Sequence, residues 1–580
     1  MKHGQWWALG VAVAAVAAVA AHPATGWLVR SHVGVLVGGS VPGFAPMGAG
    51  SGPESGTAAT TPPPVLGNDP ELAFAKAVRY YHATSITIGD SVDPASVSGR
   101  LAPLVDAVRA FPEYAPPRAA YLRLATQGAV RIGREDELRR AEGRKPVSAP
   151  AARTAPAPRR EDLAVFDRIA ADGERFNPAN AYFPTMRAIG HLAGGEDARA
   201  WDDLARAATK GTWREYVPAE AQAGDRLALE SAGGRGIGAI ARIARGAAIL
   251  YPHYAAIRSV ARLALAEAMR RETSGDVAGG IALRGAMISV GRRMRDDSTS
   301  LIGNLVGIAV VAIMESRPEG APGAKIMDKT EEQRRADEDK RNAKFADWLA
   351  RNGASAATVQ AVRDDLVVAR RIKSISQRGI DKGVFELAKL ATTVVAMIAG
   401  VLVLGNIIQM LVVRGVAEVA ARATAIARGG RLAPGSFIGG VIVALVLQLP
   451  AAVLVGRSLG QAAVAMRAFT AGGATTDDTL GLWAGASIGA ASTLLAPTLA
   501  CGFLLLRAAL TRKASFSRTV VLGMRGAALP MVAFLAVGYA GAVAWGAARD
   551  AATDREWQRS LEHEGREFAR IVGERWPGDR

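Results

Sequence analysis

The chain has 580 residues, a formal net charge of +17 and a mean hydropathy of +0.14, with 50% hydrophobic and 21% charged residues. This length exceeds what one hydrophobic core normally supports, so two or more units are expected. A single cysteine, Cys501, excludes an intramolecular disulfide, and seven scattered histidines without metal-ligand spacing exclude structural zinc.

Residues 1–29 contain Lys2 near the N-terminus, followed by a largely apolar segment. Such a segment is typical of a secretory signal peptide or of an uncleaved signal anchor. The small residues at 18–20 offer a cleavage pattern, whereas the apolar residues that continue to Val29 favour the anchor. Both interpretations stay open, and both predict that the following domain is exported.

The next segment, residues 30–69, is rich in Gly, Pro, Ser and Thr and predicts a flexible tether. Residues 70–385 predict an extracytoplasmic α-helical domain, because apolar residues recur at three and four positions. A break rich in proline and alanine interrupts this domain at 145–160. The apolar run Leu301–Met314 is too short to span a bilayer, so we expect a buried helix there. One clear apolar stripe comprises Ile257, Val260, Ala261, Ala264, Leu265 and Ala268.

Residues 177–208 carry a local pattern: an aromatic pair at Tyr182 and Phe183, then Leu192, a double glycine at 194–195, and small residues further on. This pattern resembles one tetratricopeptide repeat, in which the aromatic and the leucine of one helix pack on small residues of the next. The resemblance is confined to this segment and implies a degenerate helical repeat. Ordinary antiparallel helix pairs are the alternative, and both interpretations give an all-α domain.

The C-terminal part, residues 386–548, contains four apolar segments that are long enough to span a bilayer. None of the four contains a charged residue, and arginines stand at their edges. They predict a four-helix transmembrane bundle, followed by an amphipathic tail at 549–580. The segments are Leu390–Val413, Leu432–Val455, Thr479–Leu506 and Gly526–Ala548.

The charges of the loops between these segments predict their sidedness. The first and last loops carry nine Lys and Arg residues against one acid, Glu418, whereas the middle loop is balanced. By the positive-inside rule the first and last loops are cytoplasmic and the middle loop lies outside. Residues 30–385 and the tail are then extracytoplasmic, which requires one crossing within residues 1–29. The sequence therefore predicts a multi-pass protein of the cytoplasmic membrane.

A serine motif, G-x-S-x-G at 485–489, lies within the third of these segments. A serine nucleophile needs a base, and the four segments contain no histidine, lysine or carboxylate. We therefore interpret the glycines as helix-packing positions. The small residues predicted to pack are Gly481, Gly485, Gly489, Gly538, Ala542 and Gly546. No catalytic, cofactor-binding or metal-binding residue is predicted.

Three amides, Asn406, Gln409 and Gln448, are the polar positions within the predicted bundle. In a transporter they would line a polar path, whereas in an anchor they would pair between helices. We expect an envelope protein that presents an extracytoplasmic interaction or scaffold domain, with the lipid bilayer and a protein as partners. The alternative is a component of a transport or export system. The sequence shows no basic face interleaved with aromatic residues, so we do not expect nucleic-acid binding.

Overall fold

The computed structural model describes residues 3–22, 63–84, 94–134, 157–231, 251–315, 330–374 and 529–552 except 531 and 549, together with isolated positions. In this part of the chain the regular structure is helical and contains no strand, which confirms the all-α class. One isolated bridge pairs Asn180 with Thr212.

The chain divides into two compact units. One, here called the terminal unit, comprises Met1–Ala45, Ala228–Arg242 and Asp381–Ser560. The other, here called the helical unit, comprises Pro46–Leu227, Ile243–Ile380 and Leu561–Arg580. Each unit is described by itself.

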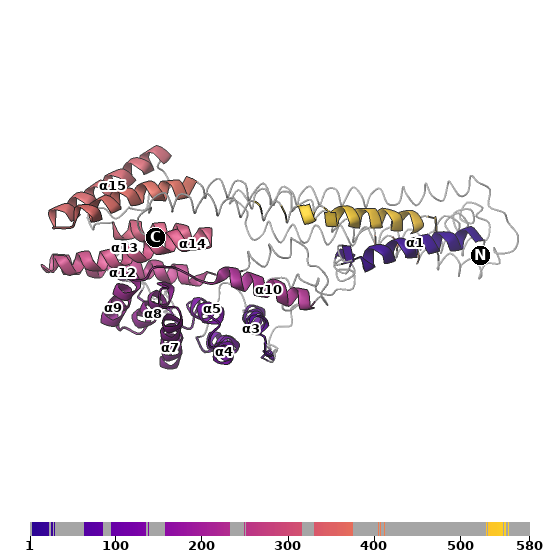
Figure 1. Cartoon of the computed structure of the whole chain (residues 1–580), viewed down its shortest axis with the longest axis horizontal. Helices are drawn as coiled ribbons and strands as arrows, with labels where there is room; N and C mark the ends of the chain where they lie inside the picture. Colours follow the sequence, from indigo (N-terminus) through magenta and orange to yellow (C-terminus); the bar gives the residue numbers. More distant parts are fainter. Residues whose placement is uncertain are drawn as a thin grey trace, which may run out of the picture. The chain divides into compact units, whose positions relative to one another are not determined.

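The helical unit consists of short and medium helices joined by turns (Figure 1). A further helix covers residues 356–374. The labelled helices are α3 (Pro70–Thr84), α4 (Pro94–Ala110), α5 (Pro116–Ala125), α7 (Arg160–Phe176), α8 (Tyr182–Ala193), α9 (Asp197–Ala208), α10 (Val217–Ser231), α12 (Pro252–Thr273), α13 (Val277–Asp297), α14 (Leu301–Met314) and α15 (Glu331–Arg351).

Successive helices of this unit pack side by side. α3 contacts α4, α4 contacts α5, α5 contacts α7, and the series continues through α8 to α9. The longer helices α12 and α13 run across this row, α12 against α5 and α8 and α13 against α9, as Figure 1 shows. α14 then packs on α12 and α13. The unit is thus a layered helical array with a continuous apolar core.

The periodicity of α12 explains its place in the core. All six residues of the stripe that runs from Ile257 to Ala268 are buried, which confirms that prediction. The helix begins with Pro252 at its first turn, where the missing amide hydrogen costs no intrahelical bond.

Three glycines in the left-handed region turn the chain between antiparallel helices. Gly195 has a φ of 79° between α8 and α9, and Gly275 has a φ of 94° between α12 and α13. Gly353, with a φ of 81°, separates α15 from the helix at 356–374. We call α15 and the helix at 356–374 together the hairpin. A side chain with a Cβ would be strained at each of these positions.

The segment that resembles a tetratricopeptide repeat forms the helix pair α8–α9. Tyr182, Phe183 and Leu192 of α8 are buried in the core, and so are Leu204 and Ala207 of α9. The glycine turn therefore joins two helices that pack on each other. The repeat character itself stays a prediction.

The apolar helix α14 belongs to the core of the helical unit. Val310, Val311 and Met314 are buried against α12 and α13. Gly307 of α14 faces the backbone of α13 so closely that a Cβ there would lie 2.6 Å from the Gly291 carbonyl oxygen. Two helices can approach in this way only where both lack side chains at the crossing.

In the terminal unit, α1 (His3–Ala21) shares an apolar cluster with residues of the C-terminal helix. Ala12, Val532, Ala536 and Tyr539 are among its buried members, and Ile407 joins them. Among the described residues one helix, Val532–Ala552, is long and apolar enough to cross a membrane. The predicted spans at 432–455 and 479–506 lie outside the described residues, so the four-span bundle stays a prediction.

Candidate functional site

A buried polar cluster centres on Glu215, which lies in the segment between α9 and α10. The indole nitrogen of Trp213 donates a hydrogen bond to Glu215 Oε1 at 2.5 Å, and the Tyr254 hydroxyl donates to Oε2 at 2.8 Å. His253 Nε2 lies 3.4 Å from the same Oε2. The Tyr254 hydroxyl also contacts Ser300 Oγ at 2.6 Å. These residues join the α9–α10 segment to the starts of α12 and α14.

Burial sets the protonation states in this cluster. It lowers the pKa of His253, despite the adjacent Glu215 carboxylate, so the imidazole is neutral at pH 7. Burial also opposes ionisation of Glu215, but the neighbouring His253, Trp213 and Tyr254 outweigh it and lower the pKa of this carboxyl. The cluster therefore holds a carboxylate surrounded by donors. This arrangement suits helix positioning, since Trp213, His253 and Tyr254 are themselves buried.

A second buried pair joins α5 to α10. The Arg123 guanidinium donates to Glu220 Oε2, and the two side chains are 1% and 6% exposed. Glu220 holds the pKa of Arg123 above its usual value, although burial acts in the opposite direction. The Tyr182 hydroxyl beside this pair donates to the Ala119 carbonyl at 3.0 Å. The pair is an internal ion pair between helices that are far apart in the sequence.

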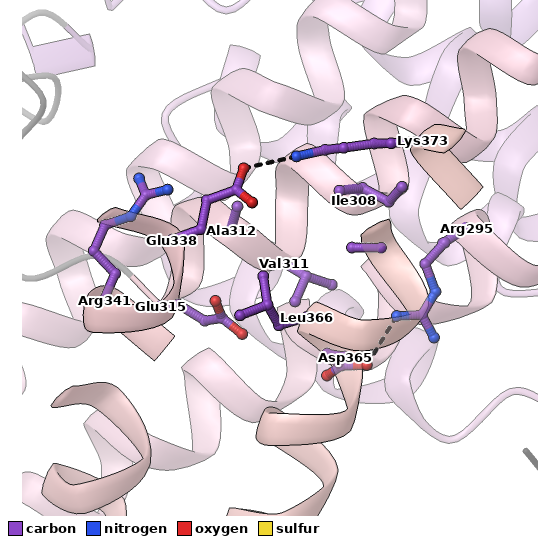
Figure 2. Close-up of a pocket in the computed structure, with 11 residues that line it drawn as sticks. Arg295, Ile308, Val311, Ala312, Glu315, Glu338, Arg341, Asp365, Leu366 and Lys373 are labelled. Carbon is purple, nitrogen blue, oxygen red and sulfur yellow. Dashed lines mark hydrogen bonds and ion pairs between the residues drawn. The ribbon is translucent and has the colours of Figure 1, made fainter. Parts of the chain in front are cut away.

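A pocket lies between the hairpin and the helices α13 and α14, as Figure 2 shows. Its volume is about 490 Å³, including the space at its open mouth. Its apolar lining comes mainly from α14 and the helix at 356–374. The charged residues of the lining are Arg295, Glu315, Glu338, Arg341, Asp365 and Lys373.

Most of these charges are paired across the pocket. Arg295 Nη1 donates to Asp365 Oδ1 at 2.8 Å, and Arg292 Nε donates to Asp365 Oδ2 at 2.7 Å. On the opposite side Lys373 Nζ donates to Glu338 Oε1 at 2.8 Å. Figure 2 shows the Arg295–Asp365 and Lys373–Glu338 pairs together with the Glu315 carboxyl. The Asp365 pair is nearly fully buried, because Arg295 and Asp365 are 1% and 2% exposed.

Glu315 differs from the other carboxyls of the pocket. It follows α14 directly and accepts a hydrogen bond from Asn342 Nδ2 at 3.3 Å. Burial, with a contribution from the charge of Asp365, raises the pKa of Glu315 to about 8. At neutral pH it is therefore mainly protonated, and it can exchange a proton with water that enters the pocket. Among the described residues no group of three His, Cys, Asp or Glu side chains could hold a metal ion.

Of the nine positions singled out in the sequence, the structure describes Gly538, Ala542 and Gly546. Asn406, Gln409 and Gln448 lie outside the described residues, as do Gly481, Gly485 and Gly489. Gly538, Ala542 and Gly546 lie in the Val532–Ala552 helix. The described core face of that helix is formed by Val532, Ala536, Tyr539 and Val543, whereas Gly538 is exposed and a Cβ there would meet nothing within 4 Å.

The sequence did not point to Glu315, Asp365 or Glu215. One signal could have found Asp365: it stands in the apolar stripe of its helix with Val362, Val368 and Ile372, at spacings of three and four. An acid at such a position must find a buried partner. Glu315 gave a weaker signal, as the first charge after a 14-residue apolar helix.

Comparisons with protein-family models, with curated proteins and with solved structures find no match for this chain. The chemistry of the described residues is therefore the basis for a functional proposal.

Proposed function

We propose that this chain is a membrane-anchored envelope protein that displays its helical unit outside the cytoplasmic membrane as an interaction or scaffold domain. The packing of the helices in the terminal unit supports this proposal, because these helices have one buried apolar face and one exposed apolar face. One face of α1 and of Val532–Ala552 is buried in the shared apolar cluster. The other face exposes large apolar side chains: Trp7, Val13, Phe534, Val537 and Trp545 are 76%, 61%, 74%, 52% and 52% exposed.

Such exposure is unfavourable in water and favourable in lipid. Apolar surface costs about 25 cal/mol for each Å² left in water, so several exposed aromatic and branched side chains on adjacent helices favour a membrane environment. At 1.5 Å per residue the 19 residues of α1 extend about 28 Å, close to the hydrocarbon thickness of a bilayer. Lipid is therefore the proposed partner of these faces.

The same cluster favours a retained signal anchor over a cleaved signal peptide. Ala12 precedes the small-residue pattern at 18–20, whereas Leu28 and Val29 follow it, and all three are buried with Val532 and Tyr539. Cleavage after Ala20 would remove one side of this cluster. We therefore propose that residues 1–29 remain part of the mature protein.

The helical unit supplies the displayed surface. It has its own continuous core, and its successive packed helices present a broad outer face, as helical-repeat proteins do when they bind other proteins. The polar clusters around Glu215 and Arg123 are buried and join helices, which suits a structural role. These properties favour protein binding over catalysis.

We expect the full-length protein to stay in membranes after an alkaline wash and to keep its N-terminal residues. The measurement is mass spectrometry of the N-terminal peptide from washed membranes of a bacterial host. Release of the intact protein by the wash, or a mature N-terminus after Ala20, would contradict the proposal.

We also expect a cysteine in the middle loop to react from outside the cell. In a Cys501→Ser background, Thr475→Cys should be labelled by an impermeant maleimide in intact spheroplasts. Arg422→Cys in the first loop is the matched control and should react only after permeabilisation. The opposite pattern would reverse the sidedness and place the helical unit in the cytoplasm.

A further inference from the structure

One end of the helical unit carries an aromatic side chain that the core leaves exposed. Phe176, the last residue of α7, is 41% exposed, and among the described residues of this unit no other phenylalanine or tryptophan is as exposed. The segments around it are the α4–α5 turn at 111–115, the α7–α8 turn at 177–181 and the α9–α10 segment at 209–216. All three segments lie within the described residues.

Two guanidinium groups contact the ring of Phe176. The Cζ atom of Arg118 on α5 lies 4.6 Å from the ring centroid, and the Cζ atom of Arg175 on α7 lies 4.9 Å from it. Arg118 is 1% exposed, whereas the side chain of Arg175 is 70% exposed. The ring is therefore held by cation–π contacts while much of it faces water.

The buried charge of Arg118 is poorly compensated. Its Nη atoms donate to the backbone carbonyls of Pro112 and Tyr114, and among the described residues it forms no ion pair with a carboxylate. The nearby Asp172 carboxylate attracts Arg118 but pairs with Arg175 at 3.0 Å. Burial lowers the pKa of Arg118, and Asp172 offsets this effect only in part. Two guanidinium groups thus share one carboxylate.

Tyr216 lies beside this group in a strained backbone conformation. Its φ of 57° is the one positive φ of a non-glycine residue in the described part of the chain. Its hydroxyl donates to Asn177 Oδ1 at 2.9 Å, next to Phe176 in the sequence. Such a conformation persists only where the surroundings fix the backbone, as they do at ligand-binding positions. The residues that form this surface, here called the Phe176 surface, are Arg118, Asp172, Arg175, Phe176 and Tyr216.

We propose that the Phe176 surface is the site at which the helical unit binds an acidic segment of a partner protein. This inference rests on the proposed function of the unit as an interaction domain. Arg175 pairs with a carboxylate of the partner, and Phe176 buries its exposed ring against the neighbouring part of the same segment. Arg118 lies too deep for direct contact and contributes positive charge. Arginine and aromatic residues are the side chains that dominate binding at protein interfaces.

The charge of the surface determines the chemistry of the partner. Two guanidinium groups against the one carboxylate of Asp172 leave an excess of one positive charge, and burial keeps water from Arg118. The exposed residues Glu113 and Arg214 on the adjoining segments balance each other. A carboxylate from the partner relieves the excess, because a desolvated charge is stabilised by an opposite charge nearby. Nucleic acid would instead need a basic groove with several stacking rings.

Fluorescence anisotropy of a labelled peptide tests the proposal on the full-length protein in a neutral detergent. The probe is a short peptide of glutamates around a central leucine, and in the comparison peptide glutamines replace the glutamates. The glutamate peptide should bind more tightly than the glutamine peptide, and its binding should weaken as salt is added. Phe176→Ala and Arg175→Gln should each weaken binding about tenfold, and both positions are exposed, so neither change opens the core.

Arg199→Gln on α9 is the matched control. Arg199 is 71% exposed and pairs with Glu196 three residues away, as Arg175 does with Asp172. This variant should bind the glutamate peptide as the unmodified protein does. A loss confined to Phe176→Ala and Arg175→Gln supports the proposal.

Four outcomes would each overturn the proposal. These are no binding of the glutamate peptide, equal binding of the glutamine peptide, unchanged binding in Phe176→Ala or Arg175→Gln, and an equal loss in Arg199→Gln. Displacement of the peptide by a single-stranded oligonucleotide that binds more tightly would also overturn it, in favour of nucleic acid. Because the test uses purified protein, its failure would leave the membrane anchoring and sidedness of the proposed function untouched.

Discussion

Replacing Arg123 with methionine should lower the free energy of unfolding of the helical unit by about 3–5 kcal/mol. The variant leaves the Glu220 carboxylate, which is 6% exposed, without the guanidinium that it contacts. Nothing else in the described surroundings replaces that charge: the nearby His82 has a pKa lowered by burial and stays neutral at pH 7. Most of the loss in unfolding free energy comes from leaving the Glu220 carboxylate buried without a counter-charge, and less comes from losing the contact itself.

The matched control lies on α12, where Arg270 pairs with Glu267 at 2.7 Å but is 69% exposed. Arg270→Met should leave the urea midpoint of unfolding essentially unchanged, because a solvated ion pair contributes little to stability. Urea unfolding of the full-length protein in detergent, followed by tryptophan fluorescence, measures both variants.

The double variant Arg123→Met with Glu220→Leu separates the two causes. If the unpaired Glu220 carboxylate causes the loss of stability in Arg123→Met, removing both charges should recover a large part of the unfolding free energy. An equal loss in the double variant would show that side-chain packing around Arg123 dominates. A single variant as stable as the unmodified protein would contradict the buried pair itself.

The features that could be predicted from the sequence are those that depend on local periodicity, namely the buried faces of helices and the turns between them. The stripe from Ile257 to Ala268 indicated which face of α12 is buried, and the double glycine at 194–195 indicated the turn between α8 and α9. Both signals come from residues within one or two helical turns of each other. Periodicity reports the buried face of a helix and does not report which helix covers it.

The polar pairs depend on contacts that no local pattern contains. Arg123 and Glu220 are 97 residues apart, and Arg292 and Asp365 are 73 residues apart. In a single sequence Arg123 and Arg292 look like any other charge on an amphipathic helix. Asp365 and Glu220 each interrupt an apolar stripe, Glu220 with Val217, Ala223 and Leu227 at spacings of three and four, so a buried acid could have been suspected at both positions, although not its partner.

Replacing Gly307 with alanine should destabilise the helical unit by about 3 kcal/mol, the upper end of what overpacking costs. The added Cβ would lie 2.4 Å from the Arg295 backbone nitrogen and 2.6 Å from the Gly291 carbonyl oxygen. Both neighbours are backbone atoms of α13, so no rotamer change relieves the contact. α13 and α14 would have to separate, which would also disturb the hairpin docked on them.

Gly285→Ala on α13 is the matched control for this substitution. A Cβ at Gly285 would meet nothing within 4 Å, and the position is exposed. Alanine there should stabilise the unit by about 0.5–1 kcal/mol, because it restricts the unfolded chain and favours the helix. The same urea titration should therefore give shifts of opposite sign for the two variants. Equal shifts would mean that α14 does not pack closely on α13.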